Sequence, residues 1–287
     1  RGVVVCKYAS SFPNFNLEVT IIEFLPRLVA MEDEEISKRL TLALKKSGIK
    51  VMIKVGVQAI SSEGELQKLQ LSADSELYAE KVLLSVGRTP QFDIATEGLD
   101  LVMDRGAIQI NDAMQTSIPR LYAIGDVTAK LQLAHTASKQ GLLAVEYILD
   151  DIKERSREHH SLNYVNIPRC TFTNPEIGSV GYTEAAAKEE FQEIIVGKFP
   201  FSASGKAMAM SATQGFVKTI ARKDNKELIG MHIMGPQAAE LIAQGAILIS
   251  QKATVDSIED IVFAHPTLSE AIMESIEDLR NLSIHKI

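Results

Sequence analysis

The spacing of apolar positions predicts alternating strands and helices in the first third of the chain. Residues 18–23 are rich in β-branched side chains and end in an acid, which is typical of a buried parallel strand. A helix opened by Asp33 is then expected to bury one face: Ile36, Leu40, Ala43 and Leu44. Further strands are expected at residues 49–55, 57–61, 66–71 and 82–86, the middle pair forming a hairpin or part of a meander. This part of the chain is predicted to be α/β.

The middle of the chain has a different pattern. Residues 111–150 predict a turn, a strand at 120–124 and a long helix at about 135–149. The charged residues 151–163 are typical of a solvated helix end or linker.

From Tyr164 onward, short apolar runs alternate with turns that contain Gly or Pro. They predict strands at 169–173, 194–199, 215–222 and 227–234, followed by helices at 236–251 and 267–280. A sheet followed by helices indicates an α+β domain.

Composition excludes several classes of function. The formal net charge of −7, without a basic stripe, argues against a nucleic-acid partner. Apolar stretches such as residues 241–249 are far shorter than the ~20 residues that span a bilayer, so no membrane partner is expected. Cys6 and Cys170 are too few and too far apart for a disulfide framework, and no metal site is expected. The chain begins at Arg1 in an apolar run, so we expect a portion of a longer protein.

The run His265-Pro266-Thr267-Leu268-Ser269-Glu270 contains a candidate base. Pro266 biases His265 toward an extended conformation on a loop ahead of a helix. A carboxylate that holds one imidazole nitrogen leaves the other free to take a proton, which makes Glu270 a candidate partner. Thr267 and Glu270 also match a helix capping box, and the two roles are compatible.

A second candidate site lies at Gly125 and Asp126, which end the run Thr116-Ser117-Ile118-Pro119-Arg120-Leu121-Tyr122-Ala123-Ile124. Glycine lets a ligand approach the backbone, and the Asp126 carboxylate can accept hydrogen bonds from sugar or ribityl hydroxyls. A helix that begins near residues 133–135 would direct its N-terminal amides to the same place. An ordinary strand-turn-helix with an Asp cap is the alternative.

The run that ends at Asp126 resembles the second flavin-contacting motif of the FAD-dependent pyridine nucleotide-disulfide oxidoreductases. The resemblance covers nearly the whole chain, and its other motifs lie at residues 86–90, 133–135, 173–184, 234–236 and 265–270. Within that family, the Leu-Ser-Glu continuation is similar to the members that oxidise dihydrolipoyl groups. Another disulfide reductase, such as a glutathione reductase relative, and a non-catalytic dimerisation module are the alternatives.

The resemblance implies the domain organisation and the catalytic pair. Residues 1–110 would be a partial, Rossmann-like NAD domain and residues 111–150 a remnant of the FAD domain. After the linker, residues 164–287 would form the α+β dimerisation domain. His265, held by Glu270, would deprotonate the dithiol substrate in the active site of the partner subunit of a homodimer. A 2-oxo acid dehydrogenase complex is a further implied partner, and the implied location is cytoplasmic, with the mitochondrial matrix as an alternative.

The resemblance also implies two cofactors, FAD and NAD. The residues implied for FAD are Gly125, Asp126, Gln132, Leu133, Ala134 and His135. Those implied for NAD are Gly2, Glu23, Val57 and Gly87. Glu23, at the end of its strand, would bind the adenine ribose hydroxyls, although an acid at a strand end can also be a plain surface residue.

Three departures from the family lead to further expectations. The redox-active CxxxxC pair and the first flavin-binding glycine motif are not in the sequence, so we expect no turnover by the isolated chain and a colourless preparation. Val5 stands where the third glycine of the NAD motif belongs, and Lys7 stands where the family has Glu, which argues against NAD binding. Residues 111–150 are expected to expose apolar faces, and hence to be poorly soluble or covered by another chain.

Overall fold

The computed structural model describes residues 2–72, 74–91, 98–154 and 161–286. Part of the predicted linker, at residues 155–160, lies outside the described residues. The chain forms two compact units: residues 1–86 with 168–287, and residues 87–167. Each unit is described by itself.

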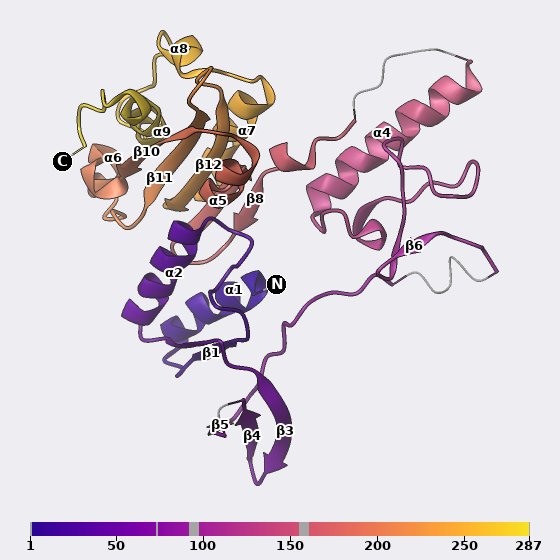
Figure 1. The fold of residues 1–287 in the computed structure, drawn as a ribbon. Coiled ribbons are helices and arrows are strands. Elements are labelled where there is room, and N and C mark those ends of the chain that lie inside the picture. Colours follow the sequence, from indigo (N-terminus) through magenta and orange to yellow (C-terminus); the bar gives the residue numbers. More distant parts are fainter. Residues whose placement is uncertain (1, 73, 92–97, 155–160, 287) are drawn as a thin grey trace. The chain divides into compact units, whose positions relative to one another are not determined.

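The first unit begins with an α/β segment (Figure 1). It comprises α1 (Val3–Ser11), β1 (Thr20–Glu23), α2 (Glu34–Lys46) and β2 (Lys50–Ile53), and β1 pairs with β2 in parallel. Asp33 caps α2 by accepting a hydrogen bond from the backbone of Glu35. The four side chains predicted to face the core of α2 are all buried. The predicted strand and helix are therefore confirmed.

A three-stranded antiparallel sheet follows. It consists of β3 (Val57–Glu63), β4 (Leu66–Leu71) and β5 (Glu76–Ala79), with β4 in the middle. The predicted hairpin is confirmed, and β5 is an additional strand. The predicted buried strand at 82–86 is wrong: this segment is not a strand, and Leu83, Leu84 and Val86 are exposed. A buried parallel strand needs a hydrogen-bonded neighbour, and none lies beside this segment among the residues that the structure describes.

The C-terminal part of the first unit contains a five-stranded antiparallel sheet in the order β10-β11-β12-β9-β8. Its strands are β8 (Arg169–Thr171), β9 (Glu176–Gly181), β10 (Ile194–Pro200), β11 (Phe216–Arg222) and β12 (Leu228–Gly235). Four were predicted, and β9 was missed. Its glycines are typical of a turn, but a Cβ at Gly178 would lie 2.4 Å from the Ala238 carbonyl oxygen. Glycine here permits a helix to pack closely on the sheet.

Helices cover this sheet. They are α5 (Glu184–Glu190), α6 (Gly205–Ala209), α7 (Ala238–Ser250), α8 (Val255–Ile258) and α9 (Glu270–Glu277). Helix α7 packs on β9 and β12, and α9 packs on β10 and β11. Both long helices were predicted, whereas the three short ones were not. A second apolar cluster joins α1, β1 and α2 to Ile177, Phe216 and Met234 of the C-terminal sheet.

The second unit contains β6 (Met103–Asp104), β7 (Ala107–Ile108) and α4 (Ala134–Ile152). Helix α4 confirms the predicted long helix. The predicted strand at 120–124 is wrong, because only a single bridge, between Gln115 and Tyr122, forms there. Among the described residues of this unit, no neighbouring strand accepts its remaining backbone hydrogen bonds. The predicted exposure of apolar faces is confirmed on α4 by Leu142, Val145, Leu149 and Ile152.

Candidate active site

His265 and Glu270 form a hydrogen-bonded pair at the start of α9. His265 Nδ1 lies 2.8 Å from Glu270 Oε1. The Thr267 backbone N–H donates to Glu270 Oε2 at 2.8 Å, so both carboxylate oxygens are engaged. The His265 side chain is 78% exposed. When Nδ1 carries the hydrogen that Glu270 accepts, the lone pair of Nε2 faces solvent and can take a proton.

The predicted capping box is only half formed. The Thr267 hydroxyl donates to the Ala264 carbonyl at 2.7 Å and does not cap the helix. Helix α9 begins at Glu270, three residues later than predicted, with Ser269 as its N-cap. The Glu270 carboxylate makes the one capping-box hydrogen bond that does form, since it accepts the Thr267 backbone N–H. The same carboxylate therefore stabilises the turn and orients the imidazole.

Electrostatics keep Glu270 ionised. Burial by itself raises the pKa of this carboxyl, but the hydrogen bonds from Thr267 and His265 outweigh burial and hold the pKa below its ordinary value. Glu270 is thus an anion at neutral pH and stabilises a positive charge on His265.

A second pair of the same kind was missed by sequence reasoning. Glu274 lies one turn after Glu270, and its Oε1 atom is 2.6 Å from His285 Nδ1. Its Oε2 atom accepts hydrogen bonds from the Ser283 hydroxyl and the Ile284 backbone, at 2.5 and 3.0 Å. The Glu274 side chain is buried, so it fixes the C-terminal tail to α9. One feature of the sequence could have revealed this pair: Glu274 is an acid on the apolar face of a predicted helix.

The turn at Gly125 is held by side chains that the sequence did not indicate. Gly125 has a φ of 75°, and its N–H donates to the buried Gln140 Oε1 at 2.7 Å. Gln140 Nε2 donates in turn to the Tyr164 hydroxyl at 2.9 Å. Asp126 is exposed and has one ion pair among the described residues, with Arg88 at 3.4 Å. Its carboxylate can therefore accept hydrogen bonds from a ligand.

The other residues implied for FAD lie at the start of α4. Leu133 is the N-cap of this helix, and no side chain caps it. Gln132, Ala134 and His135 flank that position, so the first amides of the helix lie next to them.

The structure brings together two of the four residues implied for NAD. Gly2 precedes α1 with a φ of 83°, and a Cβ there would lie 3.0 Å from Glu23 Oε2. Glu23 Oε1 accepts the Leu25 backbone N–H at 2.9 Å. Val57 begins β3 in the same unit, whereas Gly87 belongs to the second unit. The pairing of Gly2 with Glu23 places a carboxylate beside the N-terminus of α1.

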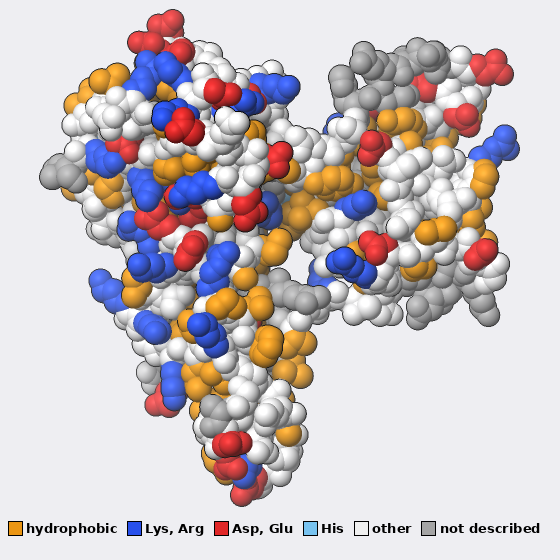
Figure 2. Space-filling model, in the orientation of Figure 1, with side chains coloured by type: hydrophobic (Ala, Val, Ile, Leu, Met, Phe, Trp, Pro, Cys, Tyr) orange, Lys and Arg blue, Asp and Glu red, His pale blue; other side chains and the backbone are white. Residues whose placement is uncertain are grey.

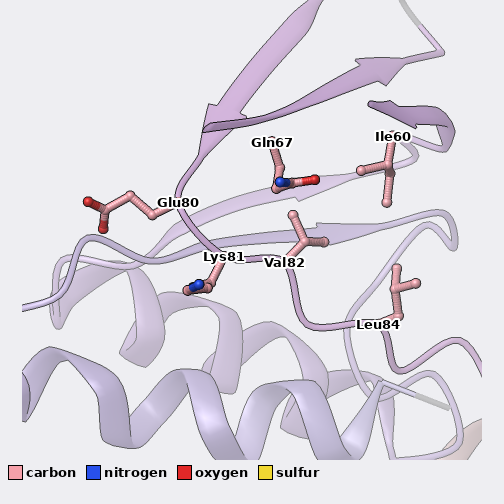
Figure 3. Close-up of a pocket in the computed structure, with 6 residues that line it drawn as sticks. All are labelled: Ile60, Gln67, Glu80, Lys81, Val82 and Leu84. Atoms are coloured by element: carbon pink, nitrogen blue, oxygen red, sulfur yellow. The ribbon is translucent and has the colours of Figure 1, made fainter. Parts of the chain in front are cut away.

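Metal ligands, membrane spans and hollows are further features by which a site can be recognised in the described part of the chain. No group of three or more His, Cys, Asp or Glu side chains there could hold a metal ion. No helix within the described ranges is long and apolar enough to cross a membrane. A hollow beside β3 and β4 is lined by Ile60, Gln67, Glu80, Lys81, Val82 and Leu84 (Figure 3). None of the predicted site residues lines it.

Comparison with known proteins gives matches along most of the chain. Residues 2–141 match the family model of the pyridine nucleotide-disulphide oxidoreductases, and residues 167–276 match the model of their dimerisation domain. The dihydrolipoyl dehydrogenase of Corynebacterium glutamicum is 40% identical over 285 residues, which cover 96% of this chain and 59% of the relative. That of Bacillus subtilis is 36% identical over 290 residues, with coverages of 99% and 60%. The chain thus spans about three-fifths of the length of these curated relatives.

Solved structures show the same fold. LpdA from Mycobacterium tuberculosis superposes with a TM-score of 0.88 at 21% identity, covering 97% of this chain and 60% of that one. The HOCl-induced flavoprotein disulfide reductase RclA from Escherichia coli gives a TM-score of 0.86 at 23% identity, with coverages of 96% and 62%.

Proposed function

The chain belongs to the pyridine nucleotide-disulphide oxidoreductase family, and from this premise we propose that it is part of a flavin-dependent dihydrolipoyl dehydrogenase. The family match confirms the predicted fold class, a mixed α/β protein with a dimerisation domain. The observation that carries the proposal is the exposed imidazole of His265, oriented by Glu270. The relatives that are 36–40% identical carry the name of this activity.

The proposed role of His265 follows from the chemistry of a dithiol. A thiol must lose its proton before its sulfur attacks a disulfide, because the thiolate is the nucleophile. His265 Nε2 takes that proton, while Glu270 keeps the ring in place and stabilises the imidazolium. We expect the substrate to lie in the active site of a second subunit, reached through the dimerisation domain.

The two cysteines of the chain do not supply the disulfide. Cys6 and Cys170 are both free, and they lie on α1 and β8. Burial, with a smaller contribution from Glu23, raises the pKa of Cys6 to about 12. Burial also raises the pKa of Cys170. Neither thiol is a reactive thiolate at neutral pH, so turnover requires a subunit that contains the redox disulfide.

The residues present fit FAD, and Gly2 and Glu23 suit NAD, whereas Val5 and Lys7 on α1 depart from the NAD motif of the family. FAD would contact Gly125, the exposed Asp126 and the start of α4. NAD would lie near Gly2, where Glu23 suits the ribose hydroxyls. When bound, FAD would pass the two electrons of the reduced cysteine pair to the nicotinamide of NAD. Val57 and Gly87 remain predicted NAD contacts.

Gly2→Ala is expected to weaken NAD binding, because the new Cβ would lie 3.0 Å from Glu23 Oε2 and shift that carboxylate. Gly48→Ala is the matched control, since Gly48 has a similar φ of 88° but open space around it. Both changes strain the backbone by about 1–2 kcal/mol. Calorimetric titration with NAD checks the difference, and equal affinities of the two variants would contradict the role of Gly2.

A mixed dimer tests the proposed function. The partner is a full-length dihydrolipoyl dehydrogenase subunit whose matching histidine has been replaced by glutamine, and two affinity tags isolate the mixed species. We expect it to reduce NAD with dihydrolipoamide, because this chain supplies His265 to the partner's site. We expect neither the isolated chain nor the homodimer of the altered subunit to do so.

Two other results would change the assignment. A mixed dimer that forms without turnover would indicate a non-catalytic dimerisation module, an alternative that the lack of a cysteine pair favours. Turnover with glutathione disulfide and a reduced nicotinamide cofactor, but not with dihydrolipoamide, would indicate another disulfide reductase. Association with a 2-oxo acid dehydrogenase complex and a cytoplasmic location remain predictions.

A further inference from the structure

A row of polar side chains crosses the C-terminal sheet from one edge to the other. Its members are direct partners in the strand register: Lys198, Lys218, His232, Ser179 and Arg169, on β10, β11, β12, β9 and β8. Direct cross-strand partners project from the same face of a sheet. Lys218, His232 and Ser179 are buried, so the centre of this row lies inside the protein, whereas Lys198 and Arg169 at its ends are partly exposed.

Acidic residues that lead into α2 pair with this row. Lys218 Nζ lies 2.8 Å from Asp33 Oδ1, and Lys198 Nζ lies 2.6 Å from Glu35 Oε2. Lys218 and Asp33 are almost fully buried. Figure 2 shows charged side chains of both signs over this part of the first unit. The start of α2 is thus held to the sheet by ionic contacts between residues far apart in the sequence.

His232 occupies the centre of the row and is fully buried. Its Nε2–H donates to the Tyr182 carbonyl at 2.9 Å, and its Nδ1 atom has no hydrogen bond among the described residues. The ring is therefore the neutral tautomer with the hydrogen on Nε2. The charged groups of the elements packed around it are Lys218 on β11, Glu32 and Asp33 before α2, and Glu184 at the start of α5.

We propose that His232 acts as a pH-dependent latch: while its ring is neutral, the ion pair of Lys218 with Asp33 holds the start of α2 to the sheet, and protonation of the ring loosens this contact. An imidazolium would place a second positive charge beside Lys218, its direct partner in the register. It would also bury that charge without an acceptor at Nδ1. The nearby carboxylates of Asp33 and Glu32 favour the imidazolium, but the cost of burying its charge outweighs them.

The direction of the pH effect follows from burial. Burial lowers the pKa of His232 below its ordinary value of 6.5, Lys218 adds to this, and Asp33 and Glu32 oppose it. The unfolded chain therefore takes up a proton at a higher pH than the folded chain. The stabilisation is complete above pH 6.5 and is lost as the pH falls below that value. For one proton, the folding equilibrium constant falls about tenfold per pH unit.

Hydrogen exchange tests the latch. Exchange is followed by mass spectrometry on peptides that cover α2, at about pH 7.5 and about pH 5.5, a range that spans the titration of histidine. After correction for the intrinsic rates, we expect α2 to lose protection at the lower pH. The pKa values of Asp33 and Glu35 lie below their ordinary values, so these acids stay charged throughout.

Two variants test whether the pH dependence of α2 protection originates at His232 or at another group. His232→Gln keeps an N–H donor for the Tyr182 carbonyl but does not titrate, so we expect α2 to be equally protected at both pH values. His285→Gln removes an exposed histidine and is expected to behave like the wild type. The latch is overturned if α2 protection in the wild type does not depend on pH, a result that needs no variant. It is overturned equally if His232→Gln retains the dependence.

Discussion

Replacing His265 with glutamine is expected to slow the oxidation of dihydrolipoamide by the mixed dimer about 10²–10⁴-fold, the typical contribution of a positioned general base. Glutamine fills a similar space but takes no proton at neutral pH. The dithiol must then lose its proton to water before its sulfur can attack. The measurement is the rate of flavin reduction after rapid mixing with dihydrolipoamide, which isolates the thiol step from later electron transfer to NAD.

Two further variants distinguish a base from a structural role for His265. Glu270→Gln keeps a side chain that can accept from Nδ1 but removes the anion, so we expect a smaller loss of rate than for His265→Gln. His285→Gln removes the tail histidine that contacts Glu274 of α9 and is expected to retain most of the rate. An unchanged rate for His265→Gln, in a mixed dimer of normal composition, would refute the assignment of the base.

Lys218→Met is expected to lower the free energy of unfolding by about 3–5 kcal/mol, because it leaves the Asp33 carboxylate buried without its positive partner. Methionine has nearly the same length and stays apolar, so the loss reflects charge more than volume. Asp33 keeps its hydrogen bonds from the backbones of Glu35 and Glu184, which limit the damage. Urea denaturation followed by circular dichroism gives the value.

Lys68→Met is the matched control for this prediction. Lys68 pairs with Glu76 at 2.8 Å on the three-stranded sheet, where solvent screens both charges. We therefore expect little change in stability from its loss. If Lys218→Met is no more destabilising than Lys68→Met, then the buried ionic contacts do not hold α2 to the sheet. The pH-dependent latch at His232 would then have no contact to release, because it acts through the same ion pair.

The sequence was enough to predict the helices and contacts that depend only on residues close together in the chain. Helix α2 has an Asp cap, acids in its first turn and a buried face at helical spacing, and each can be read over a few residues. The contact between His265 and Glu270 spans one loop and one helix start, so a proline and a five-residue separation predict it. The motifs on which the resemblance to the family rests are likewise short, contiguous runs of residues.

Strand predictions failed where a partner strand was needed. Residues 82–86 and 120–124 have the apolar composition of buried strands, but a strand forms only when a neighbour takes its backbone hydrogen bonds. Composition cannot show whether such a neighbour exists. Strand β9 is the opposite case, a strand that was not predicted. Its glycines indicated a turn, but in the structure they allow α7 to pack closely on the sheet.

The amino-acid order by itself determined the existence of helices α2 and α4, the hairpin and the pairing of the His265 imidazole with Glu270, since these depend on neighbours within a few residues. Only the tertiary structure decided that Glu274 holds His285, that Gln140 supports Gly125, and that Lys218 meets Asp33. These contacts join segments up to 185 positions apart. The reason is physical: a buried charge needs an opposite charge at close range, and folding of the chain alone determines which one lies there.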